Sequence, residues 1–364
     1  MKNIHWVYFL HSVRSLAGSL VGVFIPIYFL KLGFPLTDIF VFWLIYGFSL
    51  FIFDILAAYL SKKFGFKPVI VISAFLQFIF LYLLYILKFD PILLPIIAIV
   101  SGLQAAFYWL PINFLFTTQS NDKEMGGDTS KFFNWPKILS LPIPIISSII
   151  IVTFGFGYLF ILSGIVYAIS LYPLFRLPNI KVNFTFDFVK YKNLFKKYTR
   201  YFWAEFLENI REEFEAIILP IVILLAIKSI ISIGIINTLA QIGAILFTFL
   251  VGKLTDKKDK QKLMRIGALV MILCWIARFV FPTATIFYIV SIVVGFVEAL
   301  VLIPFSSIIY SNAKKEDPMD FLLFREFSVG LSRVFVYAVV LLFVSKLILS
   351  FILPTASLGL FMLY

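Results

Sequence analysis

The chain has 364 residues, of which 62% are hydrophobic and only 14% are charged, and its mean hydropathy is +1.03. Soluble domains are about half apolar and a quarter charged, so this composition excludes a soluble globular protein and indicates one dissolved in a bilayer. Because a membrane-spanning helix needs about 20 apolar residues, the length allows about a dozen helices and leaves no room for a separate soluble domain.

The net charge of +12 does not indicate nucleic-acid binding, because the lysines gather in short segments between apolar runs, which is the pattern of cytoplasmic loops. Cys274 is the single cysteine, so the sequence predicts no disulfide framework and no thiol metal site. His5 and His11 are too few for a metal site. We therefore expect neither a metal nor a cofactor.

Apolar runs separated by polar breaks predict about twelve transmembrane helices, because backbone groups in lipid must be satisfied within their own segment. The predicted spans are residues 4–30, 36–60, 67–88, 91–117, 131–153, 156–176, 201–227, 230–251, 263–281, 285–310, 320–344 and 347–364. The first is too long for a cleaved signal peptide, and the alternation typical of a membrane β-barrel is absent. The predicted fold class is an all-α membrane protein.

Lysine and arginine predict the orientation. With the N-terminus in the cytoplasm, the inner loops hold the basic clusters, and the outer loops carry little more than Lys31, Lys88, Lys228 and Lys346. We expect a multi-pass protein of the plasma membrane with a cytoplasmic N-terminus. The longest inner segment, residues 178–200, mixes basic residues with Phe and Tyr. It is either an amphipathic piece lying on the membrane surface or a plain linker held by anionic lipid.

An internal repeat divides the chain in two. Pro26 corresponds to Pro220 at an offset of 194 residues, and Pro111 in the fourth span corresponds to Pro304 in the tenth at nearly the same offset. A charged hairpin follows the second span and another follows the eighth, again 194 residues apart. These anchors predict two pseudo-symmetric six-helix halves, residues 1–177 and 201–364, joined by the basic linker 178–200.

Six plus six helices, a cytoplasmic middle linker and two such hairpins resemble the major facilitator superfamily, whose hairpin motif runs Gly-x-x-x-Asp-Arg/Lys-x-Gly-Arg/Lys-Arg/Lys. The second hairpin supplies Gly252, Asp256, Lys257 and Lys260, with Asp259 where the motif has glycine. The first hairpin keeps Gly65 and Lys67 but has Ala58 and Lys62 at the first glycine and the acid, and Asp54 lies where many members carry an acid.

The resemblance implies a transporter whose two halves rock about a central cavity, in agreement with the physics of repeat-built carriers, which bind near the midplane between repeats. It implies that Asp256 caps or pairs across the interface between the halves in one state. Alternatively, the hairpin charges only lie among the lipid headgroups and set the topology. For the first hairpin, Lys62 makes the usual pairing doubtful.

Charged residues inside the spans cost about 2.5–3.5 kcal/mol each, so they are candidates for function. The candidates for a substrate or coupling-ion site are Arg14, Glu208, Glu212, Glu215, Glu298, Arg325, Glu326 and Arg333. At the repeat offset Arg14 corresponds to Glu208, which predicts an ion pair between Arg14 and either Glu208 or Glu212 across the cavity. For Arg325, Glu326 and Arg333, a purely structural pairing is an equal alternative.

Glu298 lies close to the middle of the tenth span and has no basic partner on its own helix. A buried carboxyl without a partner favours its protonated form, which suits a proton carrier, and a cationic solute group is the alternative ligand. Tyr108, Trp109 and Asn113 in the fourth span could line a cavity, although core packing is the preferred interpretation. Gly102 and Gly295 are small enough to permit close helix approach.

The sequence therefore predicts a secondary active transporter that moves a small, polar or charged solute by alternating access, with proton coupling as a hypothesis. Its expected partners are membrane lipid and the solute, and we expect a monomer. No nucleotide-binding loop of the pump type is present. The alternatives are a polytopic membrane enzyme acting on lipid, for which no constellation of nucleophile, base or metal is seen, and a transporter-like sensor that moves nothing.

Overall fold

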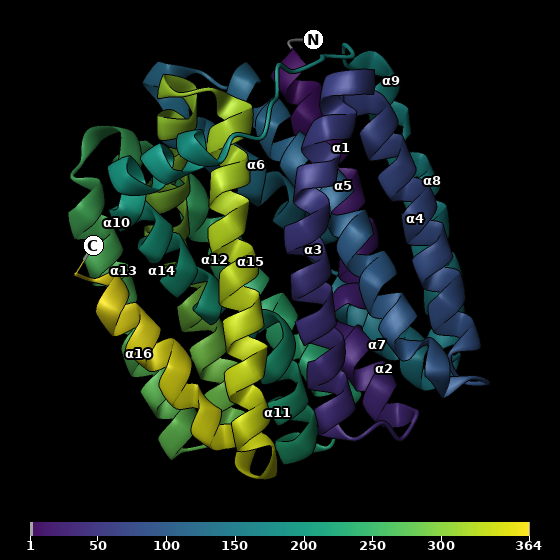
Figure 1. The fold of residues 1–364 in the computed structure, drawn as a ribbon. Helices are drawn as coiled ribbons and strands as arrows, with labels where there is room; N and C mark the ends of the chain where they lie inside the picture. The colour runs from purple at the N-terminus through teal and green to yellow at the C-terminus, as the bar shows by residue number, and fades with distance from the viewer. Residues whose placement is uncertain (1–2, 364) are drawn as a thin grey trace.

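The computed structural model describes residues 3–363, and every regular element in this range is a helix (Figure 1). The α-helices in chain order are α1 (Asn3–Val21), α2 (Ile25–Lys31), α3 (Leu36–Phe64), α4 (Phe66–Ile86), α5 (Leu94–Gln119), α6 (Met125–Ser140), α7 (Ile143–Thr153), α8 (Phe156–Ser170), α9 (Tyr172–Arg176), α10 (Phe188–Glu213), α11 (Leu219–Ile227), α12 (Ile230–Lys257), α13 (Lys260–Val280), α14 (Ala284–Lys315), α15 (Pro318–Val340) and α16 (Ile352–Phe361). The predicted all-α class is confirmed.

Ten helical segments within residues 3–363 are long and apolar enough to cross a membrane. The predicted seventh span, which holds α10 and α11, is not among them because α10 is rich in acidic and basic residues. The predicted eleventh and twelfth spans form one helical stretch, Pro318–Phe361, whose middle is the 3-10 segment Leu341–Phe351. The number of twelve separate spans therefore stays a prediction.

Two helices that correspond at the predicted 194-residue offset are interrupted at corresponding places. A 3-10 turn, Gly22–Phe24, separates α1 from α2 just before Pro26. A π-helical turn, Phe214–Ile218, separates α10 from α11 just before Pro220. Proline lacks an amide proton and crowds the preceding turn, so each break lies on the N-terminal side of its proline. The two prolines thus account for the interruptions of the α-helix before them.

Glycines bring the long helices of each half together. At Gly102 on α5, an added Cβ would lie 2.6 Å from the Ser49 Cβ of α3. At Gly295 on α14, an added Cβ would lie 2.1 Å from the Ala240 carbonyl oxygen of α12. Real Cβ atoms essentially never lie within 3.0 Å of another heavy atom, so only glycine permits these crossings. The prediction of close approach is confirmed at both positions.

The first half of the chain lies mainly on the right in Figure 1, in purple to blue, and the second half lies mainly on the left, in green to yellow. Contacts between the halves are made by α3 with α15, and by α6 and α7 with α12. At Gly234 on α12, an added Cβ would lie 2.5 Å from the Pro144 carbonyl oxygen of α7, so this interface is also closely packed.

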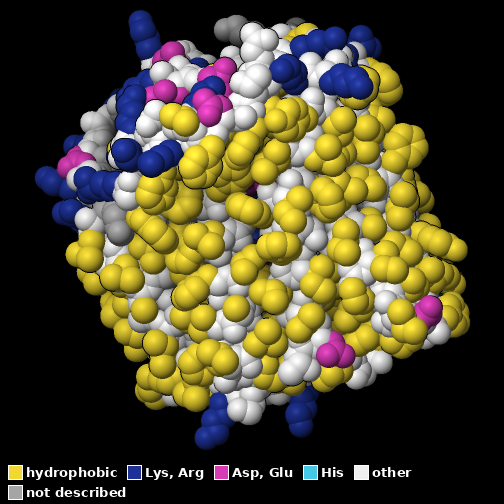
Figure 2. All heavy atoms as spheres, viewed as in Figure 1, with side chains coloured by type: hydrophobic (Ala, Val, Ile, Leu, Met, Phe, Trp, Pro, Cys, Tyr) yellow, Lys and Arg dark blue, Asp and Glu magenta, His cyan; other side chains and the backbone are white. Residues whose placement is uncertain are grey.

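Figure 2 shows a broad belt of hydrophobic side chains, with Lys and Arg gathered at the end of the molecule where the N-terminus lies. The linker runs at this same end (Figure 1). Residues 178–187 have no regular structure, and the basic residues that follow belong to α10 itself, which kinks at Tyr198 (φ −120°, ψ 23°). The linker is thus irregular in its first part and helical in its second.

Candidate functional site

The acidic residues of α10 are the starting point of the site. Glu205, Glu208 and Glu212 are spaced three and four residues apart, so they lie on one face of the helix. The helix is long enough to carry this face from the basic end of the molecule into the apolar belt. The π-helical turn that follows α10 changes the direction of the next side chains, and such turns are frequent at functional sites.

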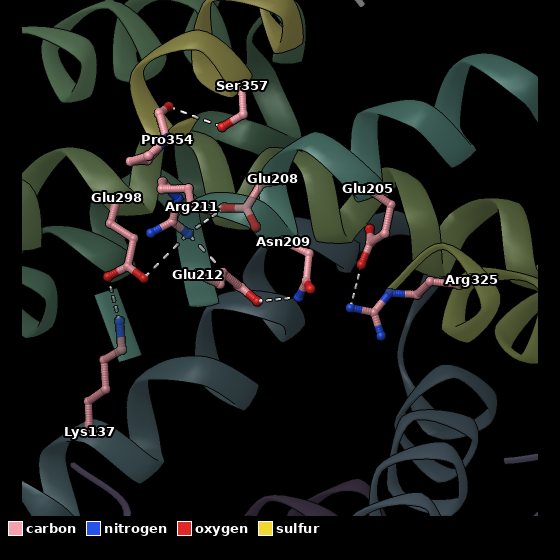
Figure 3. Close-up of polar contacts among 10 residues, drawn as sticks. All are labelled: Lys137, Glu205, Glu208, Asn209, Arg211, Glu212, Glu298, Arg325, Pro354 and Ser357. Carbon is pink, nitrogen blue, oxygen red and sulfur yellow. Dashed lines mark hydrogen bonds and ion pairs between the residues drawn. The ribbon is translucent and has the colours of Figure 1, made fainter. Parts of the chain in front are cut away.

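An ion-pair network connects this acidic face to both halves of the chain (Figure 3). The Lys137 Nζ of α6 lies 3.1 Å from Glu298 Oε2 of α14, and the Arg211 guanidinium lies 3.9 Å from the other oxygen of Glu298. Arg211 also pairs with Glu208 and lies 3.8 Å from Glu212. We call these five residues the central network.

Glu298 has no basic partner on its own helix, as the sequence indicates, but it is not a carboxyl without a partner, because Lys137 and Arg211 contact it from other helices. The partners come from α6 and α10 rather than from its own helix, so a search along the tenth span could not find them. The Glu298 side chain is 24% exposed and that of Lys137 is 26% exposed. A carboxylate held by two cations is stabilised in its ionised form, which removes the reason for making it the proton carrier.

Glu212 is the most loosely held acid of the central network. Its side chain is 39% exposed, and it accepts a hydrogen bond of 3.4 Å from the Asn209 amide. In Figure 3 its carboxylate points into the space between the helices that carry Lys137 and Arg325. Because its contact with Arg211 is long, this carboxylate can accept a cationic group or a proton and leave the close pair between Arg211 and Glu208 intact.

The arginines of α15 pair with other acids of α10. Arg325 lies 2.6 Å from Glu205 and 3.0 Å from its neighbour Glu326. Arg333 lies 2.7 Å from Glu213, which also accepts a hydrogen bond of 2.5 Å from the Tyr337 hydroxyl. These charges satisfy one another between adjacent helices of the second half, which favours the structural alternative for Arg325, Glu326 and Arg333.

Asp54 on α3 is fully buried, and neither of its carboxylate oxygens has a hydrogen-bond partner among residues 3–363. The helix packed against this part of the molecule is α15, which carries Glu326 and Arg333. At Gly47, about two turns earlier on α3, an added Cβ would touch the Arg333 Cβ at 2.8 Å. Asp54 therefore faces the interface between α3 and α15 rather than the first charged hairpin.

Arg14 does not form the predicted pair with Glu208 or Glu212. It is 3% exposed, donates a hydrogen bond of 2.7 Å to the Ser73 hydroxyl, and stacks 4.0 Å from the centre of the Tyr108 ring. All these groups belong to the first half. The repeat places Arg14 and Glu208 at equivalent positions, but the Arg14 side chain turns into its own half instead of across the interface.

A cavity of about 260 Å³ opens beside Arg14, lined by α1, α3, α4, α5 and α8. Tyr108 and Trp109 line it, and Tyr108 is at the same time buried in the core, whereas Trp109 is 38% exposed. Asn113 does not line it and instead accepts a hydrogen bond of 3.0 Å from the Tyr310 hydroxyl of α14. We call this space the Arg14 cavity.

The second charged hairpin contacts the other half of the chain. The Asp256 carboxylate accepts hydrogen bonds from the backbone amides of Gly126 at 2.8 Å and Gly127 at 3.0 Å. These amides begin α6, where free N–H groups and the helix dipole favour an anion. At Gly252 an added Cβ would lie 2.5 Å from the Ser130 hydroxyl oxygen of α6, whereas Lys257 is exposed.

The first hairpin contacts its own half instead. Gly65 has φ of +85°, and an added Cβ there would lie 2.2 Å from the Asn179 side-chain oxygen. The Asn179 amide donates to the Phe64 carbonyl, and the Lys67 ammonium donates to the Phe175 carbonyl at 3.3 Å. This hairpin therefore fastens the start of the linker.

Several residues that form these ion pairs were not among the candidates predicted from the sequence. Glu215 pairs at 2.7 Å with Arg278 of α13, away from the central network. Lys137, Arg211 and Glu213 complete the ion pairs described above, yet none was among the candidates. Their signal was present, because each is an ionisable residue inside a predicted span. Among the described residues, no group of three or more His, Cys, Asp or Glu is arranged to hold a metal ion.

Residues 7–316 match the family model described as Major Facilitator Superfamily. No curated protein matches the chain by sequence. Two similar solved structures are the human organic anion transporter MFSD10 (TETRAN) and a bacterial homologue of the iron transporter ferroportin in its outward-facing state. Their TM-scores are 0.72 and 0.73, at 11% and 10% identity, over all of this chain and 97% and 98% of theirs. At such identities the likeness carries the fold alone.

Proposed function

This chain belongs to the Major Facilitator Superfamily, and we propose that it is a secondary active transporter that moves a small, polar or charged solute by alternating access. The proposed organisation is two six-helix bundles, residues 1–177 and 201–364, joined by the linker 178–200. The bundles rock against each other about the central network. The protein lies in the plasma membrane with its N-terminus in the cytoplasm, and it works as a monomer.

The equivalent breaks before Pro26 and Pro220 support the two-bundle organisation, as do the equivalent close approaches at Gly102 and Gly295. One sequence repeat that folds twice would produce both. The cluster of Lys and Arg at the N-terminal end supports the orientation, since basic loops stay in the cytoplasm (Figure 2).

The observation that carries the proposal is the ion pair between Lys137 and Glu298. It joins α6 of the first half to α14 of the second, and both side chains are about a quarter exposed. A pair in this position is accessible enough to be opened by a competing charge. A charged solute that replaces one partner weakens the attachment between the halves, which couples binding to the rocking movement.

Asp256 acts in this scheme as a gate at the basic end. Its two hydrogen bonds to the start of α6 close that end while they last, and rocking towards the cytoplasm breaks them. Lys314 supports the same closure, because it lies 2.6 Å from Asp122 of the opposite half. The arrangement corresponds to a state closed towards the cytoplasm.

We assign the proposed proton coupling to Asp54, because Glu298 is held by two cations and Asp54 is not. Burying an ionised carboxylate without a donor is very costly, so such a group carries a proton instead. Asp54 lies at the interface that α3 forms with α15, near the charges of Glu326 and Arg333. A change in the spacing of these helices changes the cost of ionising it.

The test is uptake by proteoliposomes of a solute first selected by its stabilisation of the purified protein. We expect uptake driven by a pH gradient in the wild type and in Lys131→Met, a control on α6 that removes an exposed lysine paired within its own helix. Asp54→Asn should abolish the dependence on the gradient. Gradient-independent flux in the wild type would leave a facilitator, and no flux of any stabilising solute would overturn the transporter.

A further inference from the structure

The Arg14 cavity lies entirely within the first half of the chain, away from the central network. Its walls are mainly aromatic, contributed by Trp43, Tyr46, Phe80, Tyr108, Trp109 and Tyr167. Amides and hydroxyls lie between the rings, from Gln77, Gln104, Ser15 and Ser101. Arg14 is the one charged residue among those that line the cavity, so the cavity contains a cation and no carboxylate.

The charge of Arg14 is not balanced by the protein. Three arginines among the described residues are buried, namely Arg14, Arg211 and Arg278. Arg211 and Arg278 each lie within 4.0 Å of at least one carboxylate. Arg14 has no carboxylate within that distance, and its Nη1 has no hydrogen-bond partner among residues 3–363. The guanidinium instead makes cation–π contacts with the rings of Tyr108 and Tyr167.

Those contacts hold the guanidinium without neutralising it. Nη2 donates to the Ser73 hydroxyl at 2.7 Å, and the guanidinium carbon lies 4.0 Å from the centre of the Tyr108 ring and 5.4 Å from that of Tyr167. Cation–π contacts orient an arginine and leave its edge donors available. Arg14 thus forms part of the cavity wall, and its Nη1 is a buried donor that no group of the protein satisfies. Because a buried donor without a partner is costly, an anion that enters the cavity and reaches this guanidinium is favoured.

The size and walls of the cavity define the rest of the ligand. Ligand pockets have volumes of about 300–1,000 Å³, so about 260 Å³ suits a small molecule. A planar guanidinium matches a carboxylate through two parallel hydrogen bonds. Aromatic walls favour a flat, apolar body that can stack against them. An added Cβ at Gly22, which also lines the cavity, would meet nothing within 4 Å.

We propose that the Arg14 cavity binds a small organic acid, with its carboxylate on Arg14 and its flat apolar body between the aromatic walls. The proposal names the solute class and rests on the proposed function of the chain as a solute carrier. The bound carboxylate supplies the counter-charge that the protein lacks. An acid whose body is neutral thereby enters the first half as a neutral complex with Arg14.

The experiment measures binding by calorimetry to the full chain in nanodiscs, with benzoate and phenylacetate as probes and their neutral amides as matched comparisons. We expect at least one acid to bind ten times more tightly than its amide. Arg14→Gln should bring the two affinities within twofold of each other, mainly by weakening the acid. Lys131→Met, which leaves the cavity untouched, should keep the wild-type preference.

A second variant tests the cavity without touching the charge. Gly22→Val extends a side chain into the open space and should weaken acid and amide alike by at least tenfold, whereas Gly359→Val, also at a position with open space, should weaken neither. Equal affinity for both acids and their amides, no binding of any probe, or an acid preference that survives Arg14→Gln would overturn the proposal. Arg14-dependent binding without flux would overturn the transporter alone, and flux without acid preference would overturn this site alone.

Discussion

The ion pair between Lys137 and Glu298 should hold the two halves of the molecule together by a measurable amount. The charged atoms lie 3.1 Å apart, and each side chain is about a quarter exposed. Coulomb's law gives about 5 kcal/mol at an effective dielectric constant of 20 and about 1.3 kcal/mol in water. A partly exposed pair falls between these limits, so we expect a coupling free energy of about 2 kcal/mol.

The two single changes should not cost the same. Lys137→Met leaves Glu298 with Arg211 at 3.9 Å, so part of its compensation remains. Glu298→Gln leaves Lys137 without any carboxylate within 4.0 Å and removes one partner of Arg211. Removing one partner of a buried pair costs about 3–5 kcal/mol. We expect Glu298→Gln to approach the lower limit of this range, and Lys137→Met to cost less.

The assay is a double-mutant cycle from reversible unfolding in mixed detergent micelles, with Lys137→Met, Glu298→Gln and both together. A charge swap is a poorer choice, because it would put a lysine beside Arg211. Lys131→Met is the control, since Lys131 is 42% exposed and pairs at 3.2 Å within its own helix, a contact worth about 0.2–0.5 kcal/mol. A Lys137–Glu298 coupling no larger than that would refute the reasoning.

Three further results are expected. Asp256→Ala removes both hydrogen bonds to the amides that begin α6, and losing a helix cap costs about 0.5–2 kcal/mol in all. Cysteines introduced at the basic end should then label faster with a membrane-impermeant maleimide, and unchanged labelling would argue against the gate. Gly65→Ala should lower the thermal midpoint by several degrees because of its φ of +85° and the contact at 2.2 Å, whereas Gly359→Ala, in open space, should not; equal midpoints would contradict this. A hydrogen bond from Lys197 lowers the pKa of Glu316, so that pair stabilises the protein above the usual glutamate pKa of about 4.3 and loses its effect as the pH falls below it. The midpoint of Glu316→Gln should therefore lie below that of the wild type at pH 7, and the gap should narrow as the pH falls through the lowered pKa. A gap that stays constant into the acid range would count against the pair.

At the candidate site, the sequence identified several of the charged residues but not their partners. It found the acidic face of α10 and the isolated Glu298, because an ionisable residue in an apolar run is visible without any structure. It could not find that Lys137, 161 residues away, supplies the partner of Glu298. It paired Arg14 with Glu208 by symmetry, but equivalent positions face each other only near the symmetry axis. The Arg14 side chain instead turns to Ser73 and Tyr108.

The two charged hairpins also show which contacts a sequence motif can and cannot predict. The motif identified Asp256 as an acid that acts across the interface, and its bonds to the start of α6 agree with that expectation. The motif could not tell that the first hairpin fastens the linker through Asn179. Nor could it tell that Asp54 is buried without a donor, because the interface that α3 forms with α15 exists only in the folded molecule.

By itself, the sequence determined that the chain is an apolar, all-helical protein of a bilayer and which family it belongs to. These follow from composition, from runs of about 20 apolar residues and from short motifs, all of which are local along the chain. The tertiary structure alone decided which charges are paired, which carboxyl is left without a donor and which arginine faces a cavity. Such energies depend on distances between side chains, and helices far apart in the chain set those distances only when they pack.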